Sequence, residues 1–361
     1  MAERLKDIFF TAAFVDKLCG ALAQVHSGFS KKDFRALVHD EAWESKELLE
    51  RMHHLSYCLR ATLPDSYAEA LKILWQVAPR FEGFEALLFP DFVEQYGLED
   101  WERSLPALKY FTQFGSAEFA IRPFLLRDAK RVLVLLHECA EDAHPLVRRL
   151  ASEGCRPRLP WAVALPAFKK DPRPLLPLLE KLKNDDAETV RRSVANNLND
   201  ISKDHPELVL EICERWRGYS ERTDWIVKHA CRGLLKAKNK RALKLFGFGE
   251  TRQARVQNFK LEKKCVARGE ELHFTFELKV TGTHACKVRL EYSIDFVKAS
   301  GDTSRKVFQI AEKDFAPGVH AISKRYSTTD KTTRKHYAGK HRVAIVANGK
   351  EQAEATFVLL E

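Results

Sequence analysis

The spacing of apolar residues changes once along this 361-residue chain, and that change constrains the fold more than any other feature. In the first part, apolar residues recur every three or four positions, as in segment 48–59, which is the period of a helix. After Gly247 and Gly249, apolar and polar residues alternate, which is the period of a strand. We therefore predict a helical domain over residues 1–250 and an all-β domain over residues 251–361.

The helical part contains four segments in which an aliphatic residue precedes one or two basic residues. They are EFAIRPFLLRD, PLVRRLASEG, ETVRRSVANNLND and WIVKHACRGLLK, with Ile121, Val147, Val190 and Val227 as the aliphatic residues. Further helical segments, 174–182 and 207–215, lie between them. Helix pairs that recur about every 40 residues are typical of HEAT or armadillo solenoids, in which the second helices line a concave surface. We therefore expect a HEAT-like α-helical solenoid.

The first hundred residues have helical periodicity and no pattern that points to a function. Ser30 followed by Asp33 is typical of a helix start. We expect a longer helix from Glu41 to Leu63 and another that begins at Asp65. The aromatic residues of this region are expected to lie in the core.

The C-terminal part shows about seven short runs of alternating residues, with turn residues every ten or so positions. Asn348-Gly349 between the last two runs predicts a hairpin. An all-β immunoglobulin-like sandwich is the expected fold. Cys265 and Cys286 could form a disulfide within it, but the chain's 8 cysteines show no CxxC spacing, so we expect free thiols.

The positive charge lies in the second half of the chain. Residues 252–361 carry 21 Lys and Arg against 13 Asp and Glu, and residues 141–251 carry 22 against 16. Residues 1–140 carry 17 against 21, although the whole chain has a net charge of +10. This asymmetry indicates a polyanionic partner for the second half.

Several classes of protein are disfavoured by the composition. The first residues, MAERLKDIFF, contain charges and no apolar stretch long enough for a signal peptide, and no run of 18 apolar residues occurs. No metal-ligand spacing or nucleotide-binding loop is present, so we expect neither a metal nor a cofactor. We expect a cytoplasmic monomer with no membrane contact.

Charged residues recur four positions apart, and such residues share one face of a helix. The stripes are Arg149 with Glu153, Arg192 with Asn196 and Asp200, and Lys228 with Arg232 and Lys236. Each stripe alone can be a solvated helix face with internal ion pairs. At equivalent places in successive repeats, however, they would line up on one concave surface, where cations can follow a phosphate backbone.

Acidic residues on such a surface repel phosphate, so their presence needs a reason, and catalysis is one. Cleavage of a glycosidic bond passes through an oxocarbenium-like state that carboxylates stabilise. An aromatic face can hold a base that alkylation has made cationic. Glu153, Asp200 and Trp161 provide these groups, and Glu118 is a third acid, which could instead be a helix-start or surface residue.

Four segments carry a resemblance to a known family. They are SAEFAIRPF, HPLVRRLASEGCRPRLPWA, VRRSVANNLNDISKDHPE and WIVKHACRGLL. They resemble the AlkC branch of the HEAT-like (AlkC/AlkD-type) DNA alkylation-repair glycosylases, over about residues 5–245. The C-terminal part looks like the immunoglobulin-like domain of one subset of that branch.

The resemblance implies a monofunctional DNA N-glycosylase that excises 3-methyladenine and 3-methylcytosine from bent duplex DNA without the base flipping that is usual for glycosylases. It places catalytic acids at Glu153 and Asp200, with Glu118 near them, and an aromatic residue beside the lesion at Trp161. The cations that it implies for contact with DNA are Arg148, Arg149, Arg156, Arg158, Arg191, Arg192, Lys228 and Arg232.

A second basic segment, residues 323–342, lies in the β domain. Its cations include Lys324, Arg325, Arg334, Lys335 and Lys340, and Tyr326 and Tyr337 lie among them. The segment can be a generally basic surface, or it can be a second clamp that contacts DNA.

Two functions are therefore open. One is the glycosylase, and the other is a non-catalytic HEAT-repeat scaffold that binds nucleic acid or an acidic protein. A scaffold for DNA has no need of carboxylates on its basic face, so the acids favour the enzyme.

Overall fold

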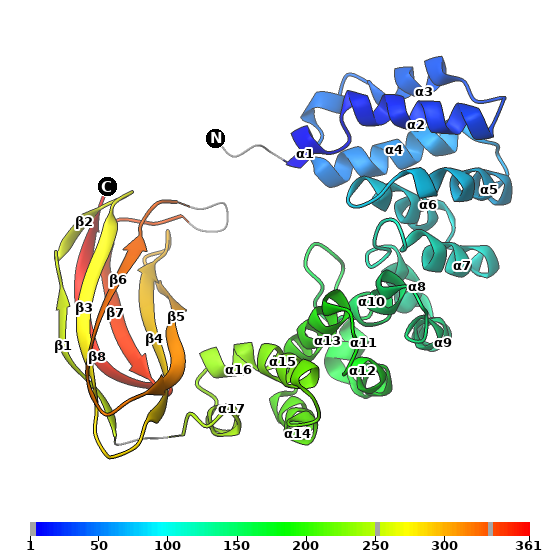
Figure 1. Ribbon diagram of the computed structural model, residues 1–361. Helices are drawn as coiled ribbons and strands as arrows, with labels where there is room; N and C mark the ends of the chain where they lie inside the picture. Colours follow the sequence, from blue (N-terminus) through cyan, green and yellow to red (C-terminus); the bar gives the residue numbers. More distant parts are fainter. Residues whose placement is uncertain (1–4, 250–252, 331–334) are drawn as a thin grey trace. The chain divides into compact units, whose positions relative to one another are not determined.

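The computed structural model describes residues 5–249, 253–330 and 335–361 (Figure 1). The chain forms two compact units, Met1–Ala230 and Cys231–Glu361. The first unit is helical and the second contains all the strands of the described residues. The predicted order of a helical solenoid followed by an all-β domain is confirmed.

Seven α-helices form the N-terminal part of the helical unit. They are α1 (Leu5–Ile8), α2 (Ala12–Val25), α3 (Lys31–Val38), α4 (Leu48–Thr62), α5 (Tyr67–Val77), α6 (Leu88–Tyr96) and α7 (Trp101–Phe111). As predicted, Ser30 caps α3, because its hydroxyl accepts a hydrogen bond from the Asp33 N–H. The long helix expected from Glu41 is wrong: α4 begins only at Leu48. The Glu50 carboxylate accepts a hydrogen bond from the Glu47 N–H at 2.7 Å, which sets a new helix start there.

The remaining helices of this unit form stacked pairs. They are α8 (Ile121–Arg127), α9 (Ala129–Cys139), α10 (Pro145–Glu153), α11 (Pro166–Lys170), α12 (Leu176–Leu182), α13 (Glu188–Ile201), α14 (Pro206–Trp216) and α15 (Glu221–Ala230). Within the pairs, α9 packs on α10, α12 on α13, and α14 on α15. The second members also pack in succession, α10 on α13 and α13 on α15. The four aliphatic residues of the predicted repeat, one of them in α8, are all fully buried, so they form the core of the stack.

The third predicted stripe is interrupted. Helix α15 ends at Ala230, and the next helix, α16 (Arg232–Lys236), begins after a turn at Cys231. Residues four apart share a face only within a continuous helix, so Lys228 and Arg232 do not form one stripe.

The second unit is a sandwich of two sheets. Its strands are β1 (Ala254–Leu261), β2 (Cys265–Ala267), β3 (Glu271–Val280), β4 (Cys286–Val297), β5 (Thr303–Phe315), β6 (Gly318–Ser327), β7 (Gly339–Ala347) and β8 (Lys350–Leu360). The sheets have the orders β1-β3-β6 and β2-β8-β7-β4-β5, and their inner faces share one apolar core. The immunoglobulin-like fold is confirmed, with eight strands among the described residues where about seven were expected.

Two details of the sandwich match the sequence. Ala347 of β7 pairs with Lys350 of β8 across a two-residue turn, and Asn348 and Gly349 have φ angles of 46° and 77°. Asparagine and glycine tolerate this left-handed conformation better than other residues, so the predicted hairpin is confirmed. Cys265 and Cys286 are free thiols, as expected.

The compact units divide at Ala230, earlier in the chain than the predicted boundary at residue 250. Helices α16 and α17 (Lys240–Leu245) belong to the unit that contains the sandwich. Lys238 Nζ lies 2.9 Å from Glu351 Oε1, and Asn348 donates a hydrogen bond to the Gly249 carbonyl at 3.1 Å. The change in hydropathy period marks the change in secondary structure, whereas the unit boundary depends on such contacts.

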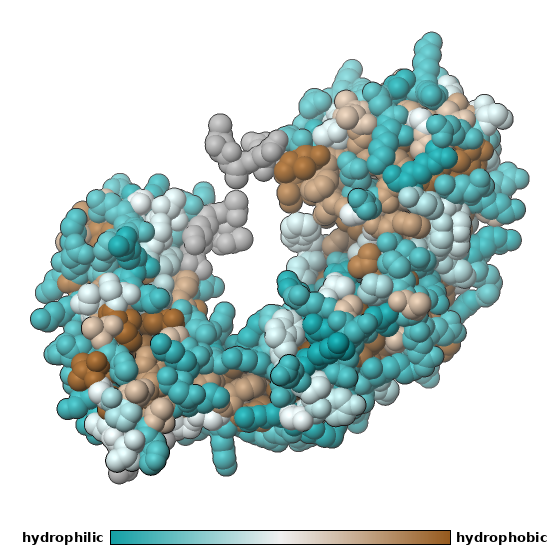
Figure 2. Space-filling view, viewed as in Figure 1, coloured by the Kyte–Doolittle hydropathy of each residue, from teal (hydrophilic) through white to brown (hydrophobic). Residues whose placement is uncertain are grey.

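Most of the visible surface is hydrophilic, with small apolar areas (Figure 2). One such area lies at α1, where Leu5 and Ile8 are 45% and 44% exposed. Among the described helices, none combines the length and the apolar character that crossing a membrane requires.

We predict that Gly115→Ala destabilises the helical unit by about 2 kcal/mol, because overpacking forces the backbone apart. A Cβ at Gly115 would lie 2.5 Å from the carbonyl carbon of Ala86 and 2.7 Å from the Leu87 nitrogen. The matched control is Gly20→Ala within α2, where an added Cβ has no neighbouring atom within 4 Å. This substitution should stabilise the helix by about 0.5–1 kcal/mol. Thermal unfolding of the two variants and the wild type is followed by circular dichroism at 222 nm. Equal melting temperatures for Gly115→Ala and the wild type would contradict the predicted overpacking.

Candidate active site

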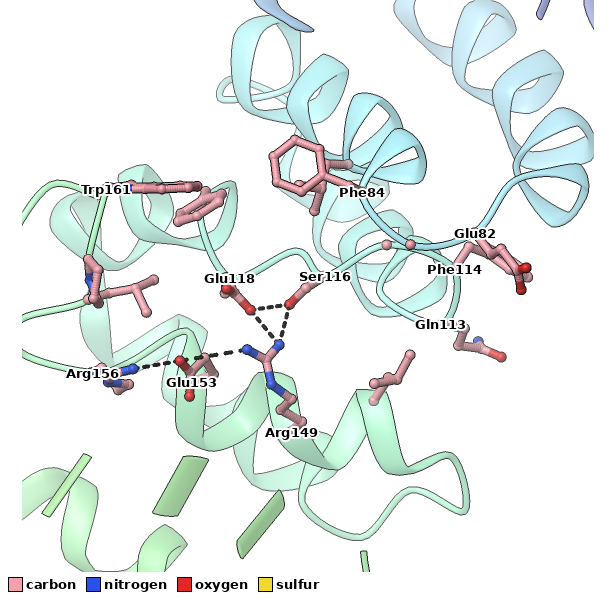
Figure 3. A pocket seen from close by; sticks show the side chains of 17 residues that line it. Glu82, Phe84, Gln113, Phe114, Ser116, Glu118, Arg149, Glu153, Arg156 and Trp161 are labelled. Carbon is pink, nitrogen blue, oxygen red and sulfur yellow. Dashed lines mark hydrogen bonds and ion pairs between the residues drawn. The ribbon is translucent and has the colours of Figure 1, made fainter. Parts of the chain in front are cut away.

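A cavity of about 840 Å³ opens in the helical unit (Figure 3). Three segments form it: the turn before α6, the segment between α7 and α8, and α10 with the loop that follows it. Its lining residues include Phe84, Phe114, Ser116, Glu118, Phe119, Arg149, Glu153, Arg156, Leu159 and Trp161. The cavity thus combines aromatic rings with three carboxylates, of Glu82, Glu118 and Glu153, and two guanidinium groups.

Four charged residues that line this cavity form ion pairs of alternating sign with one another and with Asp200 behind them, and we call the set the carboxylate network: Glu118, Arg149, Glu153, Arg156 and Asp200. Arg149 pairs with Glu118 and lies 3.6 Å from Glu153. Arg156 Nη1 lies 2.7 Å from Glu153 Oε1, and Arg156 Nε lies 2.9 Å from Asp200 Oδ2. The structure therefore brings together the three acids that the sequence predicted.

Helix ends place these acids side by side. Glu153 is the last residue of α10, and Asp200 lies in the last turn of α13, which packs on α10. The carbonyl end of a helix carries a partial negative charge, so a carboxylate there needs a cation. Arg156 provides it for both acids. Lys203, which is half exposed, adds a second contact to Asp200 at 3.1 Å.

Burial makes these pairings necessary. Glu153 is 5% exposed and Asp200 is 2% exposed, and an unpaired buried carboxylate costs several kcal/mol. Burial of the Arg149 guanidinium lowers its pKa, but the carboxylates of Glu118 and Glu153 outweigh this effect, so the pKa lies above its ordinary value. The network holds three carboxylates and two guanidinium groups, and the Lys203 ammonium at Asp200 brings the formal charge of the whole group to zero.

Trp161 lies on the loop after α10, at the rim of the cavity. Its side chain is 67% exposed, and its φ of 63° is a left-handed conformation that costs a bulky residue about 1–3 kcal/mol. In Figure 3 the rings of Trp161 and Phe84 lie on one side of the cavity, and Glu118, Arg149 and Glu153 lie opposite them. An exposed aromatic ring in a strained conformation is typical of a binding role.

Four of the predicted DNA-binding arginines are engaged within the protein, and one of them, Arg149, pairs with Glu118 and Glu153 in the carboxylate network. Arg148 contacts the carboxylates of Asp185 at 2.6 Å and Asp186 at 2.8 Å. Arg191 donates hydrogen bonds to the backbone carbonyls of the same two residues. These bonds hold the segment between α12 and α13. Arg156 is buried within the carboxylate network, so its position does not fit the phosphate contact that we predicted. The reason is that two buried acids need a cation between them.

Other predicted cations are accessible. Arg192 is exposed and pairs with Glu188, Arg158 pairs with Asp204, and Lys228 is exposed. Arg232 is half-buried in the other unit.

In the sandwich unit, Arg325, Lys335 and Lys340 are exposed and Lys324 is half-buried. Tyr337 is exposed but Tyr326 is buried in the core, and Arg334 lies outside the described residues.

Some residues of the site could not be found from the sequence. Phe84 lines the cavity although it lies in the first hundred residues, to which we had assigned no function. Ser116 donates to Glu118 and accepts a hydrogen bond from Arg149 at 2.7 Å. Arg122 is fully buried against the loop after α10. The only sign of Arg122 in the sequence is its spacing of four residues from Glu118. In the described ranges, no group of three or more His, Cys, Asp or Glu side chains has the geometry of a metal site.

Comparison with known proteins places the chain in a family. Residues 255–361 match a family model described as "Uncharacterised protein YhaZ, C-terminal Ig-like domain". The chain is 44% identical to the uncharacterized protein YhaZ of Bacillus subtilis over 354 residues, which is 98% of each protein. Its structure matches Pseudomonas fluorescens alkylpurine DNA glycosylase AlkC, bound to DNA containing an abasic site analog. The TM-score is 0.95 with 38% identity, over 99% of this chain and 100% of that one.

This chain belongs to the AlkC family. The resemblance that the four motifs indicated is therefore confirmed, and it extends over both units. The AlkC match includes the segments that form the cavity, because it covers nearly the whole chain.

We predict that Asp185→Asn destabilises the helical unit by about 1–2 kcal/mol at pH 7, because it weakens the contact with Arg148. Burial raises the pKa of Asp185, but hydrogen bonds from Arg148 and from the Ala187 N–H outweigh it, so the pKa lies below its ordinary value. A lowered folded-state pKa gives stability that is present above the unfolded pKa and is lost as the pH falls. The difference from wild type should therefore shrink below about pH 4.

Thermal unfolding at pH 7 and pH 3 measures this difference. The matched control is Glu211→Gln, an exposed carboxylate on α14. If Asp185→Asn is as much less stable than the wild type at pH 3 as it is at pH 7, the charge of the Asp185 carboxylate is not the source of the stability.

Proposed function

We propose that this protein is a DNA glycosylase that removes alkylated bases by hydrolysing the glycosidic bond of cationic bases, 3-methyladenine and 3-methylcytosine, in duplex DNA. One observation carries the proposal: a carboxylate network faces aromatic rings across an open cavity in a chain that matches AlkC over its whole length. A scaffold that only binds DNA has no use for carboxylates at such a cavity.

The chemistry suits the charge of the site. An alkylated cationic base departs as a neutral molecule when its bond to C1′ breaks, so no general acid is needed. The positive charge then moves to the deoxyribose, and carboxylates stabilise this oxocarbenium-like state. The carboxylates of Glu118 and Glu153, which line the cavity, provide that stabilisation in a partly buried setting, where it is stronger than in water. Water adds its oxygen to C1′, and its proton passes to one of these carboxylates.

The acids occupy different places in this scheme. Glu118 and Glu153 line the cavity, so they can face the deoxyribose or hold the attacking water. Asp200 does not line the cavity and joins the network through Arg156, so it acts through that guanidinium. All three acids are proposed to take part in catalysis.

Trp161 is proposed to hold the lesion. The face of an indole attracts a cation by about 0.5–2 kcal/mol, and this attraction ends when the base becomes neutral. The exposed position of the ring allows a base at the DNA surface to reach it. The proposal therefore needs no flipping of the base into a deep pocket.

Cations of both units are proposed to contact the phosphate backbone. In the helical unit these include Arg158, Arg192 and Lys228. In the sandwich they are Lys324, Arg325, Lys335 and Lys340, which form the proposed clamp. Bending a duplex costs several kcal/mol, and additional contacts of this kind offset that cost. We further propose that the protein acts as a monomer in the cytoplasm, where reducing conditions suit its free thiols.

We predict that Glu118→Gln, Glu153→Gln and Asp200→Asn each lower the rate of base release by about 100-fold, because each removes a charge that stabilises the transition state. The substrate is duplex DNA that contains 3-methyladenine or 3-methylcytosine, and released base is measured in single-turnover reactions. Glu211→Gln is the control and should keep the wild-type rate. No release by the wild-type protein would reject the glycosylase in favour of the scaffold, and full activity in all three variants would reject this site.

We predict that the combined Lys324→Gln, Arg325→Gln, Lys335→Gln and Lys340→Gln variant binds DNA more weakly and with a smaller dependence on salt. Each phosphate contact that is lost lowers the slope of log K against log salt by about 0.9. The matched control is a variant with Lys298→Gln and Lys306→Gln, which alters cations of the same unit outside the clamp. Equal affinity and an equal slope for the clamp variant and the wild type would rule out the clamp.

A further inference from the structure

Arg122 is a charged side chain that is completely buried, at the start of α8. Its guanidinium donates three hydrogen bonds, and all three acceptors are backbone carbonyls. Nε donates to Val163 at 2.6 Å, and Nη1 donates to Gly154 and to Arg156, both at 2.9 Å. Burial lowers the pKa of Arg122 to about 10.

These three carbonyls belong to the loop 154–165, which joins α10 to α11 and which we call the Trp161 loop. Gly154 and Arg156 lie at its beginning and Val163 lies near its end, so one guanidinium connects its two ends. The loop also packs closely on α8, because a Cβ at Gly154 would lie 2.7 Å from the Ile121 side chain. Arg122 therefore determines the path of this loop.

The Trp161 loop carries four residues that line the cavity, and Trp161 and Arg156 are the two with a proposed role. Trp161 lies within it in a left-handed conformation, and Arg156, whose own carbonyl accepts from Arg122, pairs with Glu153 and Asp200. A bulky residue keeps such a conformation only where the surrounding structure enforces it. The bonds from Arg122 supply that constraint at both ends of the loop.

Stability alone is a weak reason for a cation in this place. The Nη2 atom of Arg122 is buried and has no hydrogen-bond partner, and an unpaired buried donor is unfavourable. Apolar residues of similar volume often replace buried charges without loss of stability. The guanidinium is, however, the side chain that can reach several carbonyls at once, because its donors form a rigid fork.

We infer that Arg122 is a positioning residue that holds the Trp161 loop, and with it the Trp161 ring, in the geometry that base excision requires. This inference rests on the proposed function. Arg122 does not line the cavity, so it acts through the loop and not by contact with DNA.

The test compares Arg122→Met with Arg127→Met in the full-length protein. Both arginines lie on α8, but Arg127 is exposed and contacts Glu99 and the Leu98 carbonyl. We expect Arg122→Met to keep DNA affinity within about threefold, because exposed cations elsewhere hold the phosphates. Its single-turnover rate of 3-methyladenine release should fall by about 30- to 100-fold, because misplacement of site groups is that costly. Arg127→Met should change neither quantity.

A double-mutant cycle with Trp161→Ala separates positioning from a general loss of stability. If Arg122 acts through the loop, Arg122→Met should lower the rate by less than about threefold once Trp161 is absent. Losses that multiply in the double variant, or a wild-type rate for Arg122→Met, would overturn the inference. If Arg122→Met does not fold, Arg122→Lys replaces it, because a compact ammonium keeps the charge without the fork that joins both loop ends.

Limited trypsin digestion gives a readout that is independent of activity. The loop contains the Arg158–Leu159 bond, and cleavage there measures how often the loop opens. Faster cleavage in Arg122→Met, but not in Arg127→Met, supports the inference, and unchanged cleavage contradicts it. If the wild-type protein releases no base, the proposed function is wrong. The digestion still shows in that case whether Arg122 restrains the loop.

Discussion

The structure of the site depends on one constraint, which is that buried carboxylates and guanidinium groups must alternate. Glu153 and Asp200 are almost fully buried at the ends of two stacked helices. Arg156 lies between them, and its positive charge offsets the free-energy cost of burying both carboxylates. Arg149 plays the same part between Glu153 and Glu118. The chain can therefore keep three acids together without losing the fold, and the two that line the cavity, Glu118 and Glu153, can face a cationic substrate.

The aromatic part of the site follows a different principle. Its rings come from segments far apart in the sequence, and Trp161 is exposed in a conformation that is unfavourable for its type. Phe84 is held by stacking on Phe9, with ring centroids 4.9 Å apart, so the N-terminal helices support one wall of the cavity. This gives a structural role to a region in which the sequence showed only a helical period.

The sequence predicted much of the fold because hydropathy periods report directly on burial. Val147 and Val190 are core residues of successive helix pairs, and the turn at Asn348-Gly349 depends on local backbone preference. Errors arose from a local helix cap, which apolar spacing does not reveal, and from tertiary contacts. Helix α4 begins later than its apolar spacing suggests, because Glu47 and Glu50 set its start. Helices α16 and α17 join the sandwich unit because of contacts such as that of Lys238 with Glu351.

By itself, the sequence determined the order of the two folds, the basic character of the second half and the identity of the acids and the tryptophan. Each of these is visible in residue type and spacing. Only the tertiary structure decided which arginines remain accessible and which are committed to the protein. Arg148 and Arg156 have the same appearance in the sequence as Arg192. The first two are held by carboxylates from distant segments of the chain, whereas the third is exposed. The physical reason is that an ion pair depends on distance in space, which helical spacing does not specify beyond one helix.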